Sequence, residues 1–151
     1  MRRGATSVMK WFSAIYVVAI VVQVFLAGEG IFRLNNIKHS DDCDKAGAHC
    51  VANSKTLDAH RAFGSILVFA SILFLIVALL AWHHNKRIRW VSIATAVLTF
   101  LQIVLAGIGG WVGGLHPVNA MLVLGLYGWL FYTLRREAPQ AVTAPATAPA
   151  A

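Results

Sequence analysis

The chain has 151 residues, of which 58% are hydrophobic and 13% are charged, and its mean hydropathy is +0.68. Soluble domains carry about 25% charged residues, so this composition excludes an ordinary soluble protein and indicates a membrane protein. The net charge of +7 comes from basic residues beside apolar runs, so we interpret it as a topology signal and expect no nucleic-acid partner.

Four apolar runs approach or exceed the length that a helix needs to cross a bilayer. In chain order they are Trp11–Gly28, Ala62–Trp82, Trp90–Ile108 and Val118–Leu134. They predict an all-α integral membrane four-helix bundle in residues 1–137, with helices over about 9–30, 58–82, 88–108 and 116–135 and an outer loop over 31–57. The basic N-terminus resembles a signal peptide, but the first run is longer than a signal-peptide core and no clear cleavage site follows, so we expect a retained helix.

Charged residues predict how the bundle is oriented. Eight basic residues lie in the segments expected on one side, namely Arg2, Arg3, Lys10, Lys86, Arg87, Arg89, Arg135 and Arg136. By the positive-inside tendency, both termini are expected in the cytoplasm and the loop over 31–57 outside the cytoplasmic membrane. The tail over 138–151 is rich in alanine, proline and threonine, and this low-complexity composition predicts disorder.

The two cysteines, Cys43 and Cys50, both lie in the predicted outer loop, where a disulfide bond persists. Closing so short a loop stabilises a fold by about 2.5 kcal/mol on a chain-entropy estimate. A structural disulfide is therefore the first interpretation. A redox-active pair, or a metal site that also uses His39 and His49, stays open, although the spacing matches no standard zinc pattern.

A short internal repeat relates the two halves of the chain. The segments QVFLAGEG (23–30) and QIVLAGIG (102–109) agree at five of eight positions, and each is followed by a helix that opens on histidine, in HRAFG (60–64) and HPVNA (116–120). Both copies cross the membrane in the same sense, so a pseudo-two-fold axis along the membrane normal is expected to relate them. Equivalent residues then face each other across the bundle, and the predicted pairs are His60 with His116, Gln23 with Gln102, and Gly28 with Gly107.

Two facing imidazoles at one depth are what a six-coordinate haem iron requires, and bundle cores commonly hold cofactors between facing helices. We therefore predict a b-type haem ligated by His60 and His116 near the outer face. Arg61 is expected to pair with a propionate, and Gly28 and Gly107 to give the macrocycle clearance.

Less specific interpretations of the same residues stay open. Histidines at helix starts are common as interfacial polar residues, and membrane-helix glycines commonly serve close packing. Gln23 and Gln102 are expected to form interhelical hydrogen bonds, and His83 and His84 to be solvated in the basic turn.

The residues His60–Arg61, His116 and the Cys43/Cys50 pair resemble one four-helix half of haem A synthase, and the resemblance spans roughly residues 10–134. It implies that the two histidines ligate haem and that Arg61 and the cysteines match the family's arginine and outer-loop cysteines. The family's catalytic glutamate has no counterpart, because Leu57 takes its place. The chain also resembles a group of small actinobacterial four-helix membrane proteins with no known activity.

These patterns predict a haem protein that performs electron transfer or a haem-linked oxidation, either as a homodimer or with a redox partner protein. Whether it is an enzyme stays open. The alternative is a cofactor-free membrane scaffold or accessory subunit. A thiol–disulfide oxidoreductase is disfavoured because the chain has no second cysteine pair, and a transporter because no acidic residue lies inside an apolar run.

Overall fold

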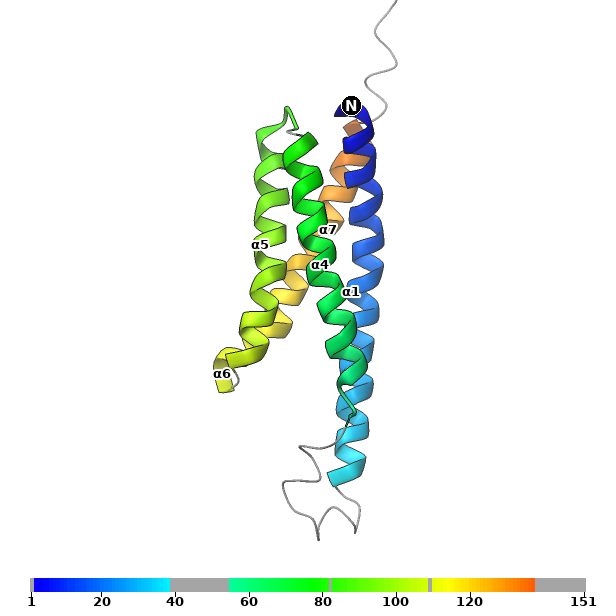
Figure 1. Ribbon diagram of the computed structural model, residues 1–151, viewed down its shortest axis with the longest axis vertical. Helices are drawn as coiled ribbons and strands as arrows, with labels where there is room; N and C mark the ends of the chain where they lie inside the picture. The colour runs from blue at the N-terminus through cyan, green and yellow to red at the C-terminus, as the bar shows by residue number, and fades with distance from the viewer. Residues whose placement is uncertain (1, 39–54, 82, 109, 138–151) are drawn as a thin grey trace, which may run out of the picture.

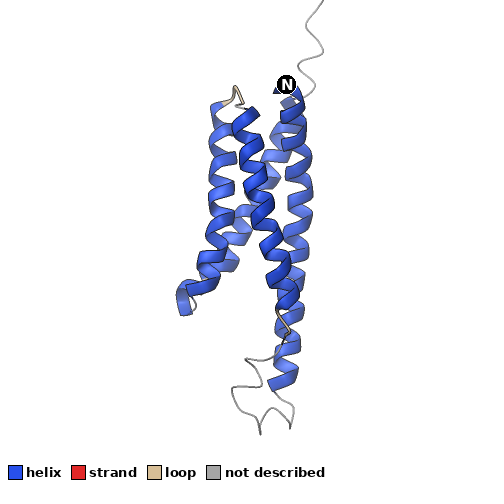
Figure 2. Cartoon of the chain, in the orientation of Figure 1, coloured by secondary structure: helices blue, strands red, loops and turns tan. Residues whose placement is uncertain are grey.

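The computed structural model describes residues 2–38, 55–81, 83–108 and 110–137, and these are almost entirely helical (Figures 1 and 2). The long helices are α1 (Arg2–Lys38), α4 (Asp58–Ala81), α5 (Lys86–Ile108) and α7 (Leu115–Glu137), and a single turn, α6 (Gly110–Gly113), connects α5 to α7. The predicted all-α four-helix bundle is confirmed for the described part of the chain. Cys43, Cys50, His39, His49 and the tail over 138–151 lie outside the described residues.

Helices α4, α5 and α7 begin and end within two residues of the predicted positions, but α1 is longer than predicted at both ends. Its 37 residues span about 55 Å, whereas a bilayer core is about 30 Å thick. Residues 31–38, which were predicted to belong to the outer loop, are therefore part of α1 in the structure. The physical reason is that a helix continues past its apolar run where i,i+4 ion pairs support it, and here Arg33 pairs with Glu29.

The four helices stand at the corners of a square. Each packs against two neighbours, in the order α1, α4, α5, α7 and back to α1, so α4 and α7 lie on one diagonal and α1 and α5 on the other. Figure 1 shows that the start of α1, the α4–α5 connection and the end of α7 lie at one end of the bundle. This up-and-down order is what the predicted pseudo-two-fold axis requires, with α1–α4 equivalent to α5–α7.

The two ends of the bundle differ in chemistry, and each is given a name here. The basic end carries Lys10, Lys86, Arg87, Arg89, Arg135 and Arg136. The histidine end carries His60 and His116, each within the first three residues of its helix.

The tightly packed core lies in the half of the bundle nearer the basic end. Phe74 and Tyr127 are fully buried, and Phe74 contacts Phe12 and Tyr127 with ring centroids 5.2 Å apart in each case. Serine and threonine hydroxyls in this half donate to carbonyl oxygens one turn back in their own helices, as Ser92 does to Ile88 at 2.8 Å. These bonds satisfy the hydroxyl groups without a partner from another helix. Because the side chains are small, neighbouring helices can pack closely there.

The outer surface of the bundle is apolar. Large side chains such as Phe69, Leu80 and Trp90 are more than 60% exposed, far more apolar surface than a soluble monomer displays. Among the described residues, four helices are long and apolar enough to cross a membrane. The fold is therefore that of a multi-pass membrane protein whose exposed apolar side chains face lipid.

Candidate functional site

A cavity of about 400 Å³ lies inside the bundle toward the histidine end, within the usual range of about 300–1,000 Å³ for small-molecule sites. All four long helices contribute to it. Its lining is mostly apolar, and the polar side chains are few: Tyr16, Gln23, His60, Arg61, Ser65, Thr99, Gln102 and His116. An apolar pocket with a few converging polar groups is the usual form of a ligand or cofactor site.

His60 and His116 face each other across this cavity from diagonal helices, as the repeat predicts. Their ring centroids are 6.2 Å apart and their planes are inclined by 75°. Two imidazoles on opposite sides of one metal ion are expected with centroids about 6 Å apart, because each metal–nitrogen bond is about 2 Å and each nitrogen lies about 1.1 Å from the centre of its ring. The separation of the two rings therefore fits a shared metal ion.

Each histidine is held by a backbone carbonyl of the preceding helix in its own repeat. His60 Nδ1 lies 3.2 Å from the carbonyl oxygen of Gln23, and His116 Nδ1 lies 3.0 Å from that of Gln102. A carbonyl oxygen only accepts hydrogen bonds, so in the neutral form of each ring this contact places the proton on Nδ1 and leaves the lone pair on Nε2. This tautomer is the one that binds metal ions through Nε2, with Nδ1–H oriented by a second group.

The glutamine side chains add a second contact within each repeat. Gln23 Nε2 donates to the carbonyl oxygen of His60 at 2.9 Å. In the amide orientation that satisfies its neighbours, the Gln102 nitrogen donates to the carbonyl oxygen of His116 at 2.9 Å. The prediction of an interhelical hydrogen bond is therefore confirmed for Gln23, and the swapped amide orientation gives Gln102 the equivalent bond. The role of their backbone carbonyls could not be predicted, because residue identity does not reveal where a main-chain oxygen points.

Arg61 lines the cavity, but its side chain is 71% exposed and its guanidinium lies 3.8 Å from the Asp58 carboxylate. An exposed pair at this distance is weak. The Arg61 head group is consequently available at the cavity mouth.

Gly28 and Gly107 do not line the cavity, and an added Cβ at either position would meet no atom within 4 Å. The structure therefore does not bring these two predicted residues together with the histidines. Close approach occurs instead at Gly30, against the backbone of Thr56, and at Gly64, against the side chain of Gln23. In the sequence, Gly64 is the small residue four positions after His60, and this position alone predicts no role for it.

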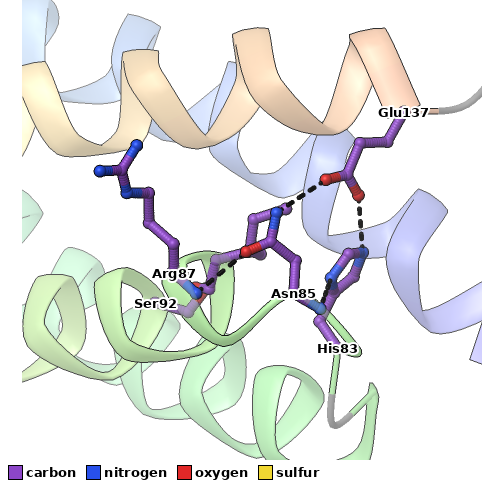
Figure 3. A network of polar contacts seen from close by, with 6 residues as sticks. His83, Asn85, Arg87, Ser92 and Glu137 are labelled. Carbon is purple, nitrogen blue, oxygen red and sulfur yellow. Dashed lines mark hydrogen bonds and ion pairs between the residues drawn. The ribbon is translucent and has the colours of Figure 1, made fainter.

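The basic end contains a second polar cluster, shown in Figure 3. His83 is only 6% exposed, so the prediction that it is solvated is wrong, whereas His84 is exposed as predicted. His83 Nε2 lies 3.2 Å from Glu137 Oε2, and Asn85 Nδ2 donates to Glu137 Oε1 at 3.0 Å. The physical reason for the burial is that Glu137, at the end of α7, contacts both His83 and Asn85 and so holds the α4–α5 turn against the bundle.

Potential metal-ligand atoms of His83, His84 and Glu137, one from each residue, lie within 4.8 Å of one another, and Glu137 Oε2 is buried with no hydrogen-bond partner among the described residues. The backbone N–H of Asn85 donates to His83 Nδ1 at 3.2 Å, so the proton of the neutral ring is on Nε2 and faces Glu137. The cluster is therefore a hydrogen-bonded contact between the α4–α5 turn and α7.

Burial lowers the pKa of His83 below its ordinary value of 6.5; the Glu137 carboxylate opposes this effect and His84 reinforces it. The unfolded chain therefore binds more protons than the folded protein below about pH 6.5, and the free energy of unfolding falls as the pH drops through that region. His83→Gln is expected to reduce the loss of stability between about pH 7 and pH 5. The measurement is thermal unfolding of detergent-solubilised protein, followed by circular dichroism. His84→Gln, on the exposed neighbour, is the matched control, and equal pH slopes in wild type and His83→Gln would contradict the assignment.

Together, the fold and the cavity define a class: a multi-pass four-helix membrane protein with a paired-histidine cavity inside one half of the bundle. Residues 46–110 match DUF6220, a family of unknown function. The matched segment covers less than half of the chain; it includes α4 and α5, and with them His60 and Gln102, but neither α1 nor His116. Among curated proteins and among solved structures, no significant match to the chain was found.

Proposed function

We propose that the protein binds one b-type haem between His60 and His116 and uses it for electron transfer or a haem-linked oxidation. The single observation that carries this proposal is the facing pair of imidazoles, with centroids 6.2 Å apart and both Nδ1 atoms against backbone carbonyls. The resemblance of the same residues to one half of haem A synthase is in accord with it.

Bound haem supplies one-electron chemistry at its iron; the chain's own residues supply the position and the environment. The Gln23 and Gln102 carbonyls orient the two rings so that both Nε2 lone pairs are unprotonated and able to bind iron. The apolar cavity lining keeps water away from the site, which influences its reduction potential. Arg61, exposed at the mouth, is placed to neutralise a carboxylate that reaches the surface.

The charge distribution supports a topology in which the basic end lies on the cytoplasmic side and the histidine end on the outer side of the membrane. The start of α1, the α4–α5 turn and the end of α7 lie at the basic end, and basic segments tend to be retained in the cytoplasm. In this orientation the haem site lies nearer the outer face of the cytoplasmic membrane, and a redox partner or a second copy of the chain would approach from that side.

The deciding experiment is an optical spectrum of protein purified from haem-replete cells, with the haem type identified after extraction in alkaline pyridine. Wild type is expected to show a Soret band of low-spin haem b, and His60→Ala and His116→Ala are both expected to lose the low-spin signal. His84→Ala, which changes an exposed histidine at the basic end, is the matched control and is expected to keep it. A wild-type protein with no Soret band would favour the alternative, a cofactor-free scaffold or accessory subunit. Full low-spin haem in either alanine variant would reject that residue as a ligand.

A further inference from the structure

The two histidine sites are related by the repeat, yet their glutamines make different contacts. Gln23 Nε2 lies 3.5 Å from His60 Nε2, the nitrogen that carries the lone pair. In the swapped amide orientation, the side-chain nitrogen of Gln102 lies 3.1 Å from Nδ1 of His116. This is the ring nitrogen other than the one proposed to bind iron. Within the described residues, an amide N–H group therefore approaches the metal-binding nitrogen of His60, and no such contact is formed at His116.

The difference follows from one position in each repeat, four residues after the histidine. That position is Gly64 in the first copy, and a Cβ placed there would lie 2.8 Å from Gln23 Nε2. In the second copy it is Ala120, whose backbone N–H donates to the Gln102 side-chain oxygen at 2.8 Å. The missing side chain at Gly64 leaves room for the Gln23 amide beside the His60 ring, whereas Gln102 is held between the carbonyl of His116 and the amide of Ala120.

Gln23 is also less firmly held than its counterpart. Its side-chain oxygen is buried and has no hydrogen-bond partner among the described residues, although buried polar atoms are nearly always paired. Both contacts of its amide nitrogen are to His60. The Gln23 side chain is therefore placed to respond to a change at His60, and its unpaired oxygen is a ready acceptor for a small ligand that donates a hydrogen bond.

We propose that His116 is the permanent haem ligand and His60 the displaceable one, with Gln23 acting as a positioning residue that accommodates the released His60. This inference rests on the proposed function and goes beyond it, because it gives the haem a coordination position that opens to a small neutral molecule. With haem bound, the exchange would break the bond between iron and His60 Nε2, the incoming molecule would donate its own lone pair in its place, and the Gln23 N–H would donate to the freed Nε2. No electron is transferred, and no proton leaves the protein.

Carbon monoxide is the probe, because it binds reduced haem only at an open position and its binding is followed optically. In wild type, carbon monoxide binds the fraction of protein whose His60 is released, so the apparent rate follows the equilibrium between bound and released His60. Gln23→Leu removes the hydrogen bond to the released ring but keeps the backbone carbonyl that holds Nδ1. A net hydrogen bond corresponds to about a two- to tenfold change in an equilibrium constant, so Gln23→Leu is expected to slow carbon monoxide binding by about that factor. Gly64→Ala is expected to act in the same direction because its Cβ would displace the Gln23 amide.

Four variants separate this role from general damage. Gly125→Ala, where an added Cβ would meet no atom within 4 Å, is the glycine control and is expected to bind carbon monoxide at the wild-type rate. Gln102→Leu is expected to lower the share of protein that retains haem without slowing binding in the protein that keeps it. His60→Ala is expected to retain a high-spin haem that binds carbon monoxide quickly, whereas His116→Ala is expected to lose haem.

Two outcomes would overturn the inference while leaving the haem site intact. One is carbon monoxide binding to Gln23→Leu and Gly64→Ala at or above the wild-type rate; another is equal haem loss in His60→Ala and His116→Ala. A wild-type protein without haem would instead remove the proposed function, and this inference with it.

Discussion

Phe74→Ala is expected to lower the free energy of unfolding by about 3 kcal/mol or more, the usual cost of a large-to-small change in a packed core. The Phe74 side chain is 0% exposed and its ring contacts those of Phe12 and Tyr127. In a membrane the loss is one of van der Waals contact rather than of transfer from water, because lipid is as apolar as the core. The measurement is unfolding in mixed micelles by increasing sodium dodecyl sulfate, monitored by circular dichroism.

Phe69→Ala is the matched control for this variant, since Phe69 is on the same helix and 70% exposed. A lipid-facing phenylalanine leaves no internal void when it is shortened, so the expected change in unfolding free energy is well under half that of Phe74→Ala. Similar losses in the two variants would show that the packed half of the bundle does not dominate stability.

Gly30→Ala and Gly28→Ala are expected to change stability in opposite directions although the positions are two residues apart. At Gly30, an added Cβ would lie 2.7 Å from the backbone oxygen of Thr56 and 2.6 Å from a methyl carbon of Leu57. Backbone cannot rotate away, so overpacking of about 1–3 kcal/mol outweighs the gain in helix propensity of about 1 kcal/mol.

At Gly28 an added Cβ would meet no atom within 4 Å, and Gly28→Ala is expected to raise the unfolding free energy by up to about 1 kcal/mol from helix propensity alone. The same detergent titration measures both variants. A stabilising Gly30→Ala would show that the start of α4 does not pack on α1 as closely as the structure has it.

The site follows from the duplicated helical hairpin. Each repeat brings one histidine against a backbone carbonyl of its own first helix, and the antiparallel square then sets the two histidines on a diagonal. Both histidines line the cavity, which all four long helices enclose in part.

The amino-acid sequence by itself determined the class of fold, the positions of α4, α5 and α7, and the pairing of His60 with His116. Hydrophobic runs of membrane-spanning length leave the backbone no alternative to helix, and a repeated motif places equivalent residues at equal depth about a symmetry axis. Both properties depend on local pattern and spacing, which can be read directly from the amino-acid sequence.

Only the tertiary structure decided how α1 ends, that His83 is buried against Glu137, and that Gly28 and Gly107 are not among the residues that line the cavity. It also decided that Gln23 approaches Nε2 of His60 while Gln102 stays beside Nδ1 of His116. The physical reason is common to all of these features. Each depends on which face of a helix meets which neighbour, and on where backbone oxygens and single methyl groups lie, and this information exists only once the helices have packed.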